Sequence, residues 1–368
     1  MARYIHQLKA WPNVYWDNDL LLNTLAEVRH LQGRLLGRMQ GLGFDFRQEA
    51  LLKTLTLDVI KSSEIEGEHL KSDEVRSSVA RKLGINLPDL VLSSRDIDGI
   101  AEILVDATRN CKDLLSSERL FAWHNALFPS RFSGIHKITV GKWREDDKGP
   151  MQVVSGAMGF EFVHFEAPDS KKVPQEMKEF LNWFNSDVPL DPILKTAVAH
   201  FMFITIHPFD DGNGRIARAI ADLLLARADG VNQRFYSMSA QIRIERKKYY
   251  HMLESTQKGS LDISSWMVWF LECLQRTLLA AESQLAEVLF KASFWDKNRQ
   301  QIFNVRQHLM MNKLLDGFDG KLNSSKWAKI CKCSSDTAIR DINDLITKGI
   351  LLRNESGGRS TSYSIQKS

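Results

Sequence analysis

The chain has 368 residues, of which 43% are hydrophobic, so it is long enough for two or three domains with substantial cores. Its formal net charge of only +4 excludes a polyanion binder that acts through overall charge alone. No apolar run approaches the roughly eighteen residues of a membrane span, and no charged segment followed by an apolar one opens the chain. We therefore expect a cytoplasmic protein.

The four cysteines predict a reducing compartment and no zinc site. Cys111 and Cys273 stand alone in the sequence. Cys331 and Cys333 are neighbours, but they lack the spacing and the companion ligands of a zinc site.

Residues 1–97 are predicted to form an N-terminal helical module. Apolar residues recur at helical spacing over 20–39 and 51–66, which indicates two long helices. The second of these helices ends in Ser62-Ser63-Glu64-Ile65-Glu66-Gly67. Taken alone, Glu66 would be an ordinary solvated carboxylate at a helix end.

The best hairpin candidate lies between residues 151 and 165. Met151–Gly156 and Phe160–Phe165 are two runs rich in β-branched and aromatic residues, joined by a connection that contains glycine. Such a hairpin could equally be a surface feature without chemistry.

The segment His207–Arg218 places a potential base, two carboxylates, a glycine-rich turn and two arginines within twelve residues. An apolar run over 198–206 precedes it, and residues 215–228 read as a helix, so the polar turn should connect two buried helices. Gly212 and Gly214 allow positive φ and a close approach of the backbone. This density of polar groups indicates chemistry rather than packing.

The same turn is suited to a polyphosphate, because the first N–H groups of a helix have no internal partner and bind anions. Arg215 and Arg218 are three residues apart and can grip phosphate oxygens together. Asp210 or Asp211 can supply the carboxylate that a magnesium ion on two phosphates needs. His207 can take a proton from an attacking hydroxyl. The lysine of a Walker loop is missing, which argues against an ordinary ATPase or kinase.

The tail, residues 291–368, is predicted to be a separate module. Residues 304–315, 324–330 and 334–348 indicate three helices, and the segments 349–353 and 363–365 indicate two strands. This order resembles a winged helix-turn-helix, whose second helix of the pair normally reads DNA.

The charge of this tail leaves its partner open. Residues 300–368 hold eleven Lys and Arg against six Asp and Glu, but Asp336, Asp341 and Asp344 lie on the expected reading helix. Acidic groups on that helix repel phosphate. DNA binding and a protein-contact or self-regulatory role both remain alternatives.

Over all twelve positions, His207–Arg218 is similar to the Fic-domain signature His-Pro-Phe-x-Asp/Glu-Gly-Asn-Gly-Arg-x-x-Arg. The resemblance implies a mainly α fold with a helical core, assigned to residues 98–290, and a β-hairpin flap. It also implies transfer of AMP from ATP to a Ser, Thr or Tyr hydroxyl of a protein, with Mg²⁺ as cofactor. The roles it implies are His207 as general base, Phe209 as loop anchor, Asp211 as metal ligand, Gly212, Asn213 and Gly214 as phosphate cradle, and Arg215 and Arg218 as ligands of the β- and γ-phosphates.

The resemblance extends to the hairpin and to a helix that follows the core. In the family, a hairpin flap aligns the target protein by strand addition, and Val153, Val154, Ser155 and Gly156 match the flap position that touches the nucleotide. His164 and Pro168 match a stretch that we interpret as structural. The basic and aromatic run over residues 246–251 could indicate nucleic acid, but Tyr249 and Tyr250 match a pair that lines the adenine and ribose pocket. Gln257 stands where some relatives have asparagine.

The end of the second long helix also resembles a family motif. Ser62, Glu66 and Gly67 fit the inhibitory pattern Ser/Thr-x-x-x-Glu-Gly/Asn. The resemblance implies that Glu66 pairs with Arg218 and takes the guanidinium that should hold the γ-phosphate. Because the motif precedes the core, the chain resembles the class with an N-terminal inhibitory helix.

Two hypotheses follow from the sequence. The first is an autoinhibited protein adenylyltransferase, and the second is a DNA-binding transcriptional regulator whose core senses nucleotide. The sequence leaves open the target, the nucleotide, the direction of AMP transfer in vivo and the oligomeric state, with a homodimer as one expectation.

Overall fold

The computed structural model describes residues 3–88, 90–147, 149–156, 160, 162–318, 320–354 and 361–366. Within this part of the chain there are fifteen α-helices and three antiparallel two-stranded sheets, so the fold is mainly α, as predicted. Among the helices described, none is both long and apolar enough to cross a bilayer.

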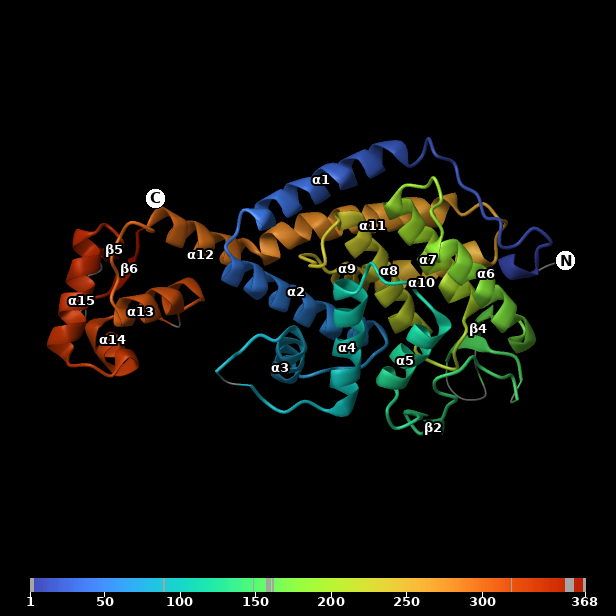
Figure 1. Ribbon diagram of the computed structural model, residues 1–368, viewed down its shortest axis with the longest axis horizontal. Coiled ribbons are helices and arrows are strands. Elements are labelled where there is room, and N and C mark those ends of the chain that lie inside the picture. Colours follow the sequence, from blue (N-terminus) through green and yellow to red (C-terminus); the bar gives the residue numbers. More distant parts are fainter. Residues whose placement is uncertain are drawn as a thin grey trace. The chain divides into compact units, whose positions relative to one another are not determined.

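Two compact units make up the chain (Figure 1). The first unit comprises Met1–Gly41 and Arg47–Ser283, and the second comprises Leu42–Phe46 and Gln284–Ser368. The predicted helical module and most of the predicted core therefore share one unit, and the second unit begins close to the predicted boundary at residue 291.

Among the described residues, the first unit contains two short 3₁₀ helices, eleven α-helices that lie in it wholly or mainly, and two small sheets. The bounds are η1 Ile5–Gln7, α1 Leu22–Gln40, α2 Phe44–Ile65, α3 Ser72–Leu83, α4 Arg95–Arg109, α5 Ser117–Leu127, β1 Phe132–Ser133, β2 His136–Lys137, β3 Gln152–Ser155, β4 Phe162–Glu166, η2 Ser170–Lys172, α6 Val173–Asn185, α7 Pro192–Ile206, α8 Asn213–Asp229, α9 Met238–Ile244, α10 Arg246–Gln257 and α11 Ser264–Gln284.

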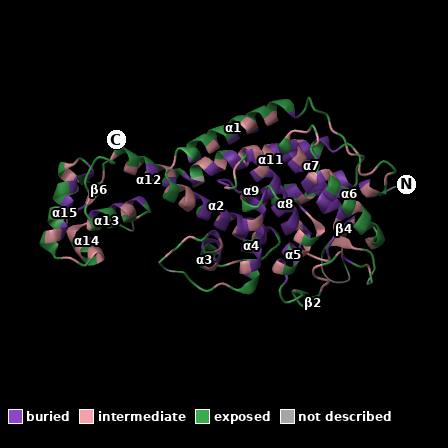
Figure 2. Cartoon of the chain, viewed as in Figure 1, coloured by how far each residue is buried: buried purple, intermediate pink, exposed green. Residues whose placement is uncertain are grey.

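The centre of this unit is the pair α7 and α8, which pack against each other more extensively than any other pair of helices described. Both helices are buried along most of their length (Figure 2). Helix α7 begins at Pro192, whose fixed φ suits a first helical position, and the Asp191 side chain caps it by accepting from the Ile193 N–H. The loop between these two helices is the predicted polar turn, so it emerges from the most extensively packed pair of helices described.

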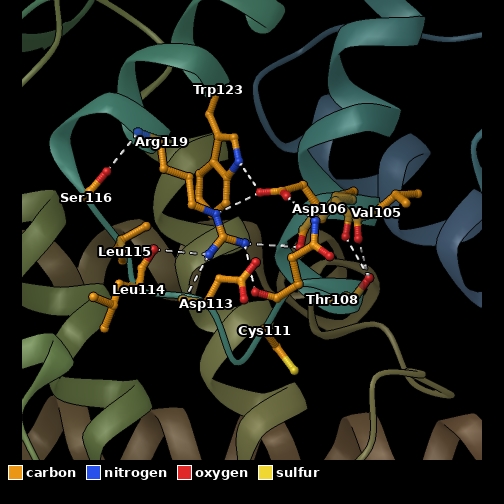
Figure 3. A network of polar contacts seen from close by, with 12 residues as sticks. Val105, Asp106, Thr108, Cys111, Asp113, Leu114, Leu115, Ser116, Arg119 and Trp123 are labelled. Carbon is orange, nitrogen blue, oxygen red and sulfur yellow. Dashed lines mark hydrogen bonds and ion pairs between the residues drawn. The ribbon is translucent and has the colours of Figure 1, made fainter.

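Helix α5 is fixed to the end of α4 by Arg119 (Figure 3). Its Nε donates to Asp106 Oδ2 at 2.8 Å, and its Nη atoms donate to the carbonyls of Asn110 and Asp113 at 3.1 Å each. Trp123 Nε1 donates to the same Asp106 oxygen at 2.7 Å. One partly buried carboxylate thus orients the helix that carries His124 toward the α7–α8 loop.

The predicted hairpin is present as β3 and β4, which pair antiparallel with a bulge between Val153 and Val154. Phe165 packs with Tyr4 near the hairpin's base. The tip, residues 157–159 and 161, lies outside the described residues. The short pair β1 and β2 was not predicted from the sequence.

The second unit has its own core around Trp327, Ile342 and Leu345, all fully buried. Asn323 and Ser334 cap its two central helices by accepting from backbone N–H groups. Helices and strands occur in the predicted order, while residues 355–360 of the expected wing are not described. The helices and strands of the second unit are α12 Ala286–Lys297, α13 Val305–Leu315, α14 Ser324–Cys331, α15 Ser335–Thr347, β5 Leu351–Arg353 and β6 Tyr363–Ile365.

Candidate active site

The α7–α8 loop is held in one conformation by its own side chains. His207 ends α7 in the left-handed region, at φ 52°, which is uncommon for a residue other than glycine. Phe209 is fully buried and stacks on His124, with ring centroids 4.1 Å apart. Asn213 Oδ1 accepts from the Phe209 N–H, and Asn213 Nδ2 donates to the Phe209 carbonyl, at 3.0 and 2.7 Å. The loop is therefore closed on itself.

Arg144 ties this loop to the base of the hairpin, and the sequence did not single out this role. Its Nε donates to the His207 carbonyl at 2.8 Å, and its backbone N–H donates to the Pro208 carbonyl at 2.9 Å. Another nitrogen of the guanidinium donates to the Pro168 carbonyl just after β4, and a third pairs with Asp146. The α7–α8 loop and the hairpin are thus connected through one buried cation.

The His207 imidazole is arranged as a proton acceptor. Its Nδ1 lies 3.2 Å from the Ile204 carbonyl, which can only accept, so the proton of the neutral ring sits on Nδ1 and Nε2 keeps its lone pair. Burial lowers the pKa of His207 to about 4, against an ordinary value of 6.5. The ring is therefore neutral near neutral pH, which is the form that a general base requires.

The two aspartates of the loop have different surroundings. Asp210 Oδ2 accepts from the Thr139 N–H at 2.8 Å. Asp211 Oδ1 accepts from the Gly212 N–H at 2.6 Å, and its Oδ2 accepts from the Ser133 hydroxyl. Asp211 thus points a fixed carboxylate toward the start of α8. The described residues contain no cluster of three or more carboxylates, histidines or cysteines suited to a metal ion.

Glu66 meets Arg218, as the motif comparison predicted. The Arg218 Nη2 lies 2.8 Å from Glu66 Oε1, and Arg218 also donates to the Ser62 hydroxyl and carbonyl, at 2.9 Å each. A Cβ at Gly214 would lie 2.4 Å from Glu66 Oε1, so only glycine there permits this approach. Gly214 is helical and serves the close approach, whereas Gly212, at φ 80°, needs the left-handed conformation.

The neighbouring arginine is occupied in the same way by a residue that sequence reasoning missed. Arg215 Nη1 lies 2.9 Å from both carboxylate oxygens of Glu68. Gly67 takes a left-handed φ of 89° just after α2, and this turn directs Glu66 and Glu68 toward the same end of α8. The local signal was an acidic residue immediately after the motif, but its partner lies 147 residues away.

These observations agree with the comparison of the chain with known protein families. Residues 114–225 match the model of the Fic/DOC family. This match spans α5, the hairpin, α6, α7 and α8 up to its last turn. The chain contains a Fic/DOC domain. Residues 4–85 match a second model, described as a domain of unknown function, DUF4172.

Relatives of known name cover only part of the chain. A segment of 104 residues is 36% identical to the protein adenylyltransferase Fic of Drosophila willistoni, and a segment of the same length is 36% identical to that of Drosophila melanogaster. Each segment is 28% of this chain and 19% or 20% of the relative. The chain therefore spans about a fifth of the length of these relatives.

Solved structures share the fold at low identity. A Fic family protein from Desulfovibrio desulfuricans G20 matches with a TM-score of 0.61 and 19% identity, over 97% of this chain and 99% of that chain. A Fic domain containing signaling protein from Bacteroides thetaiotaomicron VPI-5482 matches with a TM-score of 0.52 and 19% identity, over 71% of this chain and 97% of that chain. These similarities establish the Fic-type helical fold.

Tyr249 and Tyr250, which follow the Fic/DOC domain in the chain, differ in burial and in hydrogen-bond partners. Tyr250 donates from its hydroxyl to Glu66 Oε2 at 3.3 Å and is only partly buried. Tyr249 is 1% exposed, packs against Trp269, and lies with its hydroxyl 2.9 Å from His200 Nε2. Of the two rings predicted to line a nucleotide pocket, Tyr250 alone has an accessible surface. Gln257 is buried and donates to Thr205 at 3.2 Å.

The four flap residues lie on β3 and just after it, where the Fic/DOC hairpin faces solvent. Val153 and Val154 pair with β4, and Gly156 has φ 114°. Within the described residues β3 has β4 as its sole partner, so its other edge can accept an added strand. The Ser155 hydroxyl lies 2.6 Å from His164 Nε2, a contact that our structural interpretation of His164 did not include.

A deeper polar network joins the same two helices that carry Ser62 and Arg218. Asp58 on α2 accepts from the Ser237 hydroxyl, and Asp222 on α8 pairs with Arg234 at 2.8 Å. Burial, and then the nearby Asp58 carboxylate, raise the pKa of Asp222 well above its ordinary range. Buried polar groups of this kind restrict how two helices can slide. We infer that they hold α2 in register with α8.

Acid should destabilise this unit through its buried histidines. Burial lowers the pKa of His124 to about 4 and that of His200 to about 3, as it lowers that of His207. The folded state keeps these rings neutral, whereas the unfolded chain protonates them near 6.5. The contribution of these neutral rings to the free energy of unfolding is complete above pH 6.5. It is lost as the pH falls toward about 4. Each fully buried ring should cost on the order of 2 kcal/mol at pH 5.

Urea unfolding followed by tryptophan fluorescence at pH 7.5 and pH 5.5 measures this effect. We expect a clearly lower midpoint at pH 5.5. His200→Gln keeps a side chain that can bond the Tyr249 hydroxyl, and this variant should show a smaller difference between the two pH values. Equal midpoints for the parent would contradict the expectation.

Proposed function

We propose that the protein transfers AMP from ATP to a Ser, Thr or Tyr hydroxyl of a target protein or of itself, and that Glu66 restrains this activity. One observation carries the proposal: both arginines at the start of α8 bind carboxylates of the segment that follows α2. Carboxylate oxygens present the same kind of anionic acceptor as phosphate oxygens. The contacts made by Glu66 and Glu68 are therefore those that a bound polyphosphate would make.

The residues of the loop supply the parts of an in-line displacement at the α-phosphorus. His207 Nε2 would accept the proton of the attacking hydroxyl, and the first N–H groups of α8 would bind phosphate oxygens. Arg215 and Arg218 would hold the β- and γ-phosphates and neutralise the charge that develops on the leaving pyrophosphate. The exposed edge of β3 would align the target's backbone beside His207.

Asp211 fits the part of a magnesium ligand. Mg²⁺ in such sites is usually held by one or two carboxylates together with substrate phosphates, and Asp211 offers a single carboxylate held by Ser133 and the Gly212 N–H. When bound, the ion would neutralise phosphate charge and orient the leaving group.

The inhibitory half of the proposal follows from competition for a buried guanidinium. Arg218 is 2% exposed, so a γ-phosphate and the Glu66 carboxylate cannot both occupy the same face of it. With Glu66 in place, ATP would bind with its phosphates displaced, and the α-phosphorus would not line up with His207. Ser62 supports this state by accepting from the same arginine.

Incubation with Mg²⁺ and ATP labelled at either the α- or the γ-position tests the proposed reaction. We expect protein-bound label from the α-position only. Label from the γ-position would indicate a kinase-like reaction, and an absence of label from the parent and from a released variant would contradict the proposal.

Glu68 should contribute a smaller part of the restraint. Its carboxylate is about half exposed, with 47% of its side-chain surface accessible, and exposed ion pairs are worth about 0.2–1 kcal/mol. Glu68→Gln should therefore tighten the binding of MgATP by roughly 1.4- to fivefold. Titration calorimetry measures this. Glu74→Gln removes a carboxylate paired with Lys71 away from the arginines and is the matched control; equal affinities for the two variants would contradict the role of Glu68.

A nucleotide-sensing DNA-binding regulator remains the second candidate, and the second unit contains an observation in its favour. Asp341, counted from the sequence as an acid on the reading helix, is buried and pairs with Arg306 at 2.7 Å. Asp344 pairs with Lys348. Two of the three repelling charges are thus neutralised by neighbours, while Arg340 is exposed on α15.

Anisotropy of a labelled random DNA duplex tests this candidate. If α15 and the exposed Lys329 each meet one phosphate, affinity should fall about tenfold between 50 and 200 mM salt. The double variant Lys329→Ala with Arg340→Ala should lose most of this salt dependence. An absence of binding at 50 mM would exclude the candidate.

A further inference from the structure

Two rows of polar residues face each other where α2 meets α8. Asp58, Ser62 and Glu66 follow one another at intervals of four residues, so they lie on one face of α2 and of the turn that ends it. Arg218 and Asp222 are spaced alike on α8. Ser62 and Glu66 both contact Arg218. One turn further along, Asp58 and Asp222 are both buried, and a hydrogen bond joins their carboxyl groups.

The hydrogen bonds around these two carboxyl groups leave one place for a proton. Asp222 Oδ1 lies 2.8 Å from Arg234 Nη1, and Asp58 Oδ1 accepts from the Ser237 hydroxyl. Asp222 Oδ2 is buried and meets no donor in the part of the chain that the structure describes. Ionised carboxylates can only accept, so two of them cannot bond each other unless one carries a proton. A proton on Asp222 Oδ2, donated to Asp58, satisfies both groups.

The charged groups that face Asp222 come from three directions, and together with burial they favour its neutral form. Burial, and then the Asp58 carboxylate on α2, raise the pKa of Asp222 well above its ordinary range. Arg234, from the segment after α8, and Arg218, one turn earlier on α8, oppose this shift without outweighing it. The charge of Arg234 is also shared with Asp229. The carboxyl pair therefore keeps its proton near neutral pH, and the two groups titrate as a unit.

From this geometry we infer that Asp58 and Asp222 share one proton, and that this proton positions α2 so that Glu66 reaches Arg218. The inference rests on the proposed restraint by Glu66 and adds the residues that position it. Asp222 is one turn from Arg218, and Asp58 is about two turns from Glu66, so a change of spacing at the carboxyl pair reaches the ion pair along both helices.

The direction of the pH dependence follows from the raised pKa of Asp222. The hydrogen bond between the two carboxyl groups is complete at low pH and is lost as the pH rises through that pKa. Two buried carboxylates then repel each other across the contact between α2 and α8. Glu66 leaves Arg218, and the restraint weakens as the solution becomes alkaline.

The ratio of two labelling rates measures the restraint at each pH. The rate with Mg²⁺ and α-labelled ATP is measured for a protein that carries Glu66 and is divided by the rate of the same protein with Glu66→Gly at the same pH. Effects of pH on His207 and on ATP cancel in this ratio. For the parent, we expect the ratio to rise about tenfold between pH 7 and pH 9, the scale of one lost hydrogen bond to a charged group.

Two variants separate the shared proton from pH effects elsewhere in the protein. Asp222→Asn keeps the bridge without a titrating proton, because its Nδ2 can donate to Asp58 while its Oδ1 accepts from Arg234. We expect the same low ratio at pH 7 and at pH 9. Asp58→Ala removes the acceptor and leaves Asp222 to pair with Arg234, so the fold is retained. Its ratio at pH 7 should be about tenfold above that of the parent.

Asp229→Asn is the matched control. It neutralises another buried carboxyl group of α8, about two turns beyond Asp222, which bonds to Gln32 and to the Tyr236 hydroxyl. Because this carboxyl group does not bond to Asp58, the control should keep the pH dependence of the parent.

Titration calorimetry with MgATP separates this inference from the proposed function, since binding requires no transfer. Relative to Glu66→Gly at the same pH, the parent should gain about tenfold in affinity between pH 7 and pH 9, and Asp222→Asn should gain nothing. This result without any label would contradict the proposed function and support the inference. A parent whose ratio and relative affinity are the same at both pH values, or a pH dependence that Asp222→Asn retains, would overturn the inference.

Discussion

Replacing Glu66 with glycine should raise self-labelling of the protein from α-labelled ATP by roughly ten- to a hundredfold. The change removes one charged hydrogen bond to Arg218, and such a bond is worth about 1.5–3 kcal/mol. Each 1.4 kcal/mol corresponds to about a tenfold change in occupancy. Arg218 would then be free for the γ-phosphate. Initial rates of label incorporation, measured for parent and variant at the same ATP concentration, give the ratio.

The control for this change is Glu64→Gly, two residues earlier on α2. Glu64 pairs with Lys61 and Arg243 and does not reach Arg218. The Glu64→Gly variant also loses a carboxylate and gains a glycine near the end of the same helix. If both variants labelled at the same rate, the effect would come from loosening α2 and not from releasing Arg218.

Removing the imidazole of His207 should abolish most of this activity. In the Glu66→Gly background, His207→Ala should lower the transfer rate about 10²- to 10⁴-fold, the usual range for a lost general base. Binding of MgATP should be retained, because Arg215, Arg218 and the N–H groups of α8 are untouched. Rate and affinity measured on the same preparation separate loss of chemistry from loss of the fold.

His251→Ala is the matched control for this second change. His251 lies on α10 and is exposed, so its replacement removes a histidine of the same unit without touching the loop. Equal rates for the His207 and His251 variants, with both binding ATP, would show that His207 is not the base.

In the proposed function, the contacts between α2 and α8 would connect the restraint to the chemistry. Gly214 leaves room for the Glu66 carboxylate, and Gly67 turns the chain so that Glu68 reaches Arg215. Under the proposed function, a shift of the short segment after α2 would take both carboxylates off the arginines and leave the two guanidiniums to a polyphosphate.

The sequence predicted those parts of the site that are local or paired by a motif. The polar turn that begins at His207 connects two buried helices as expected, and Glu66 meets Arg218. Helix α2 begins at Phe44, seven residues before the predicted start at 51, because residues 44–50 lack the apolar spacing on which the prediction relied. Periodicity detects buried faces and misses exposed helical turns.

The contacts that the sequence did not predict join residues far apart in the chain. Arg144 meets His207 over 63 residues, and His164 meets Glu254 over 90. Each of these side chains looks ordinary in its local context, since an arginine near a strand or a glutamate on a helix is usually solvated. These side chains come into contact only in the folded chain, and no sequence spacing predicts such a contact.

The most direct measurement of the central claim is label from α-labelled ATP in three proteins side by side: the parent, Glu66→Gly, and Glu66→Gly with His207→Ala. We predict weak labelling of the parent, strong labelling of Glu66→Gly, and a return to background in the double variant. Equal labelling of the parent and Glu66→Gly would contradict the restraint by Glu66. Strong labelling of the double variant would contradict the assignment of His207 as the base.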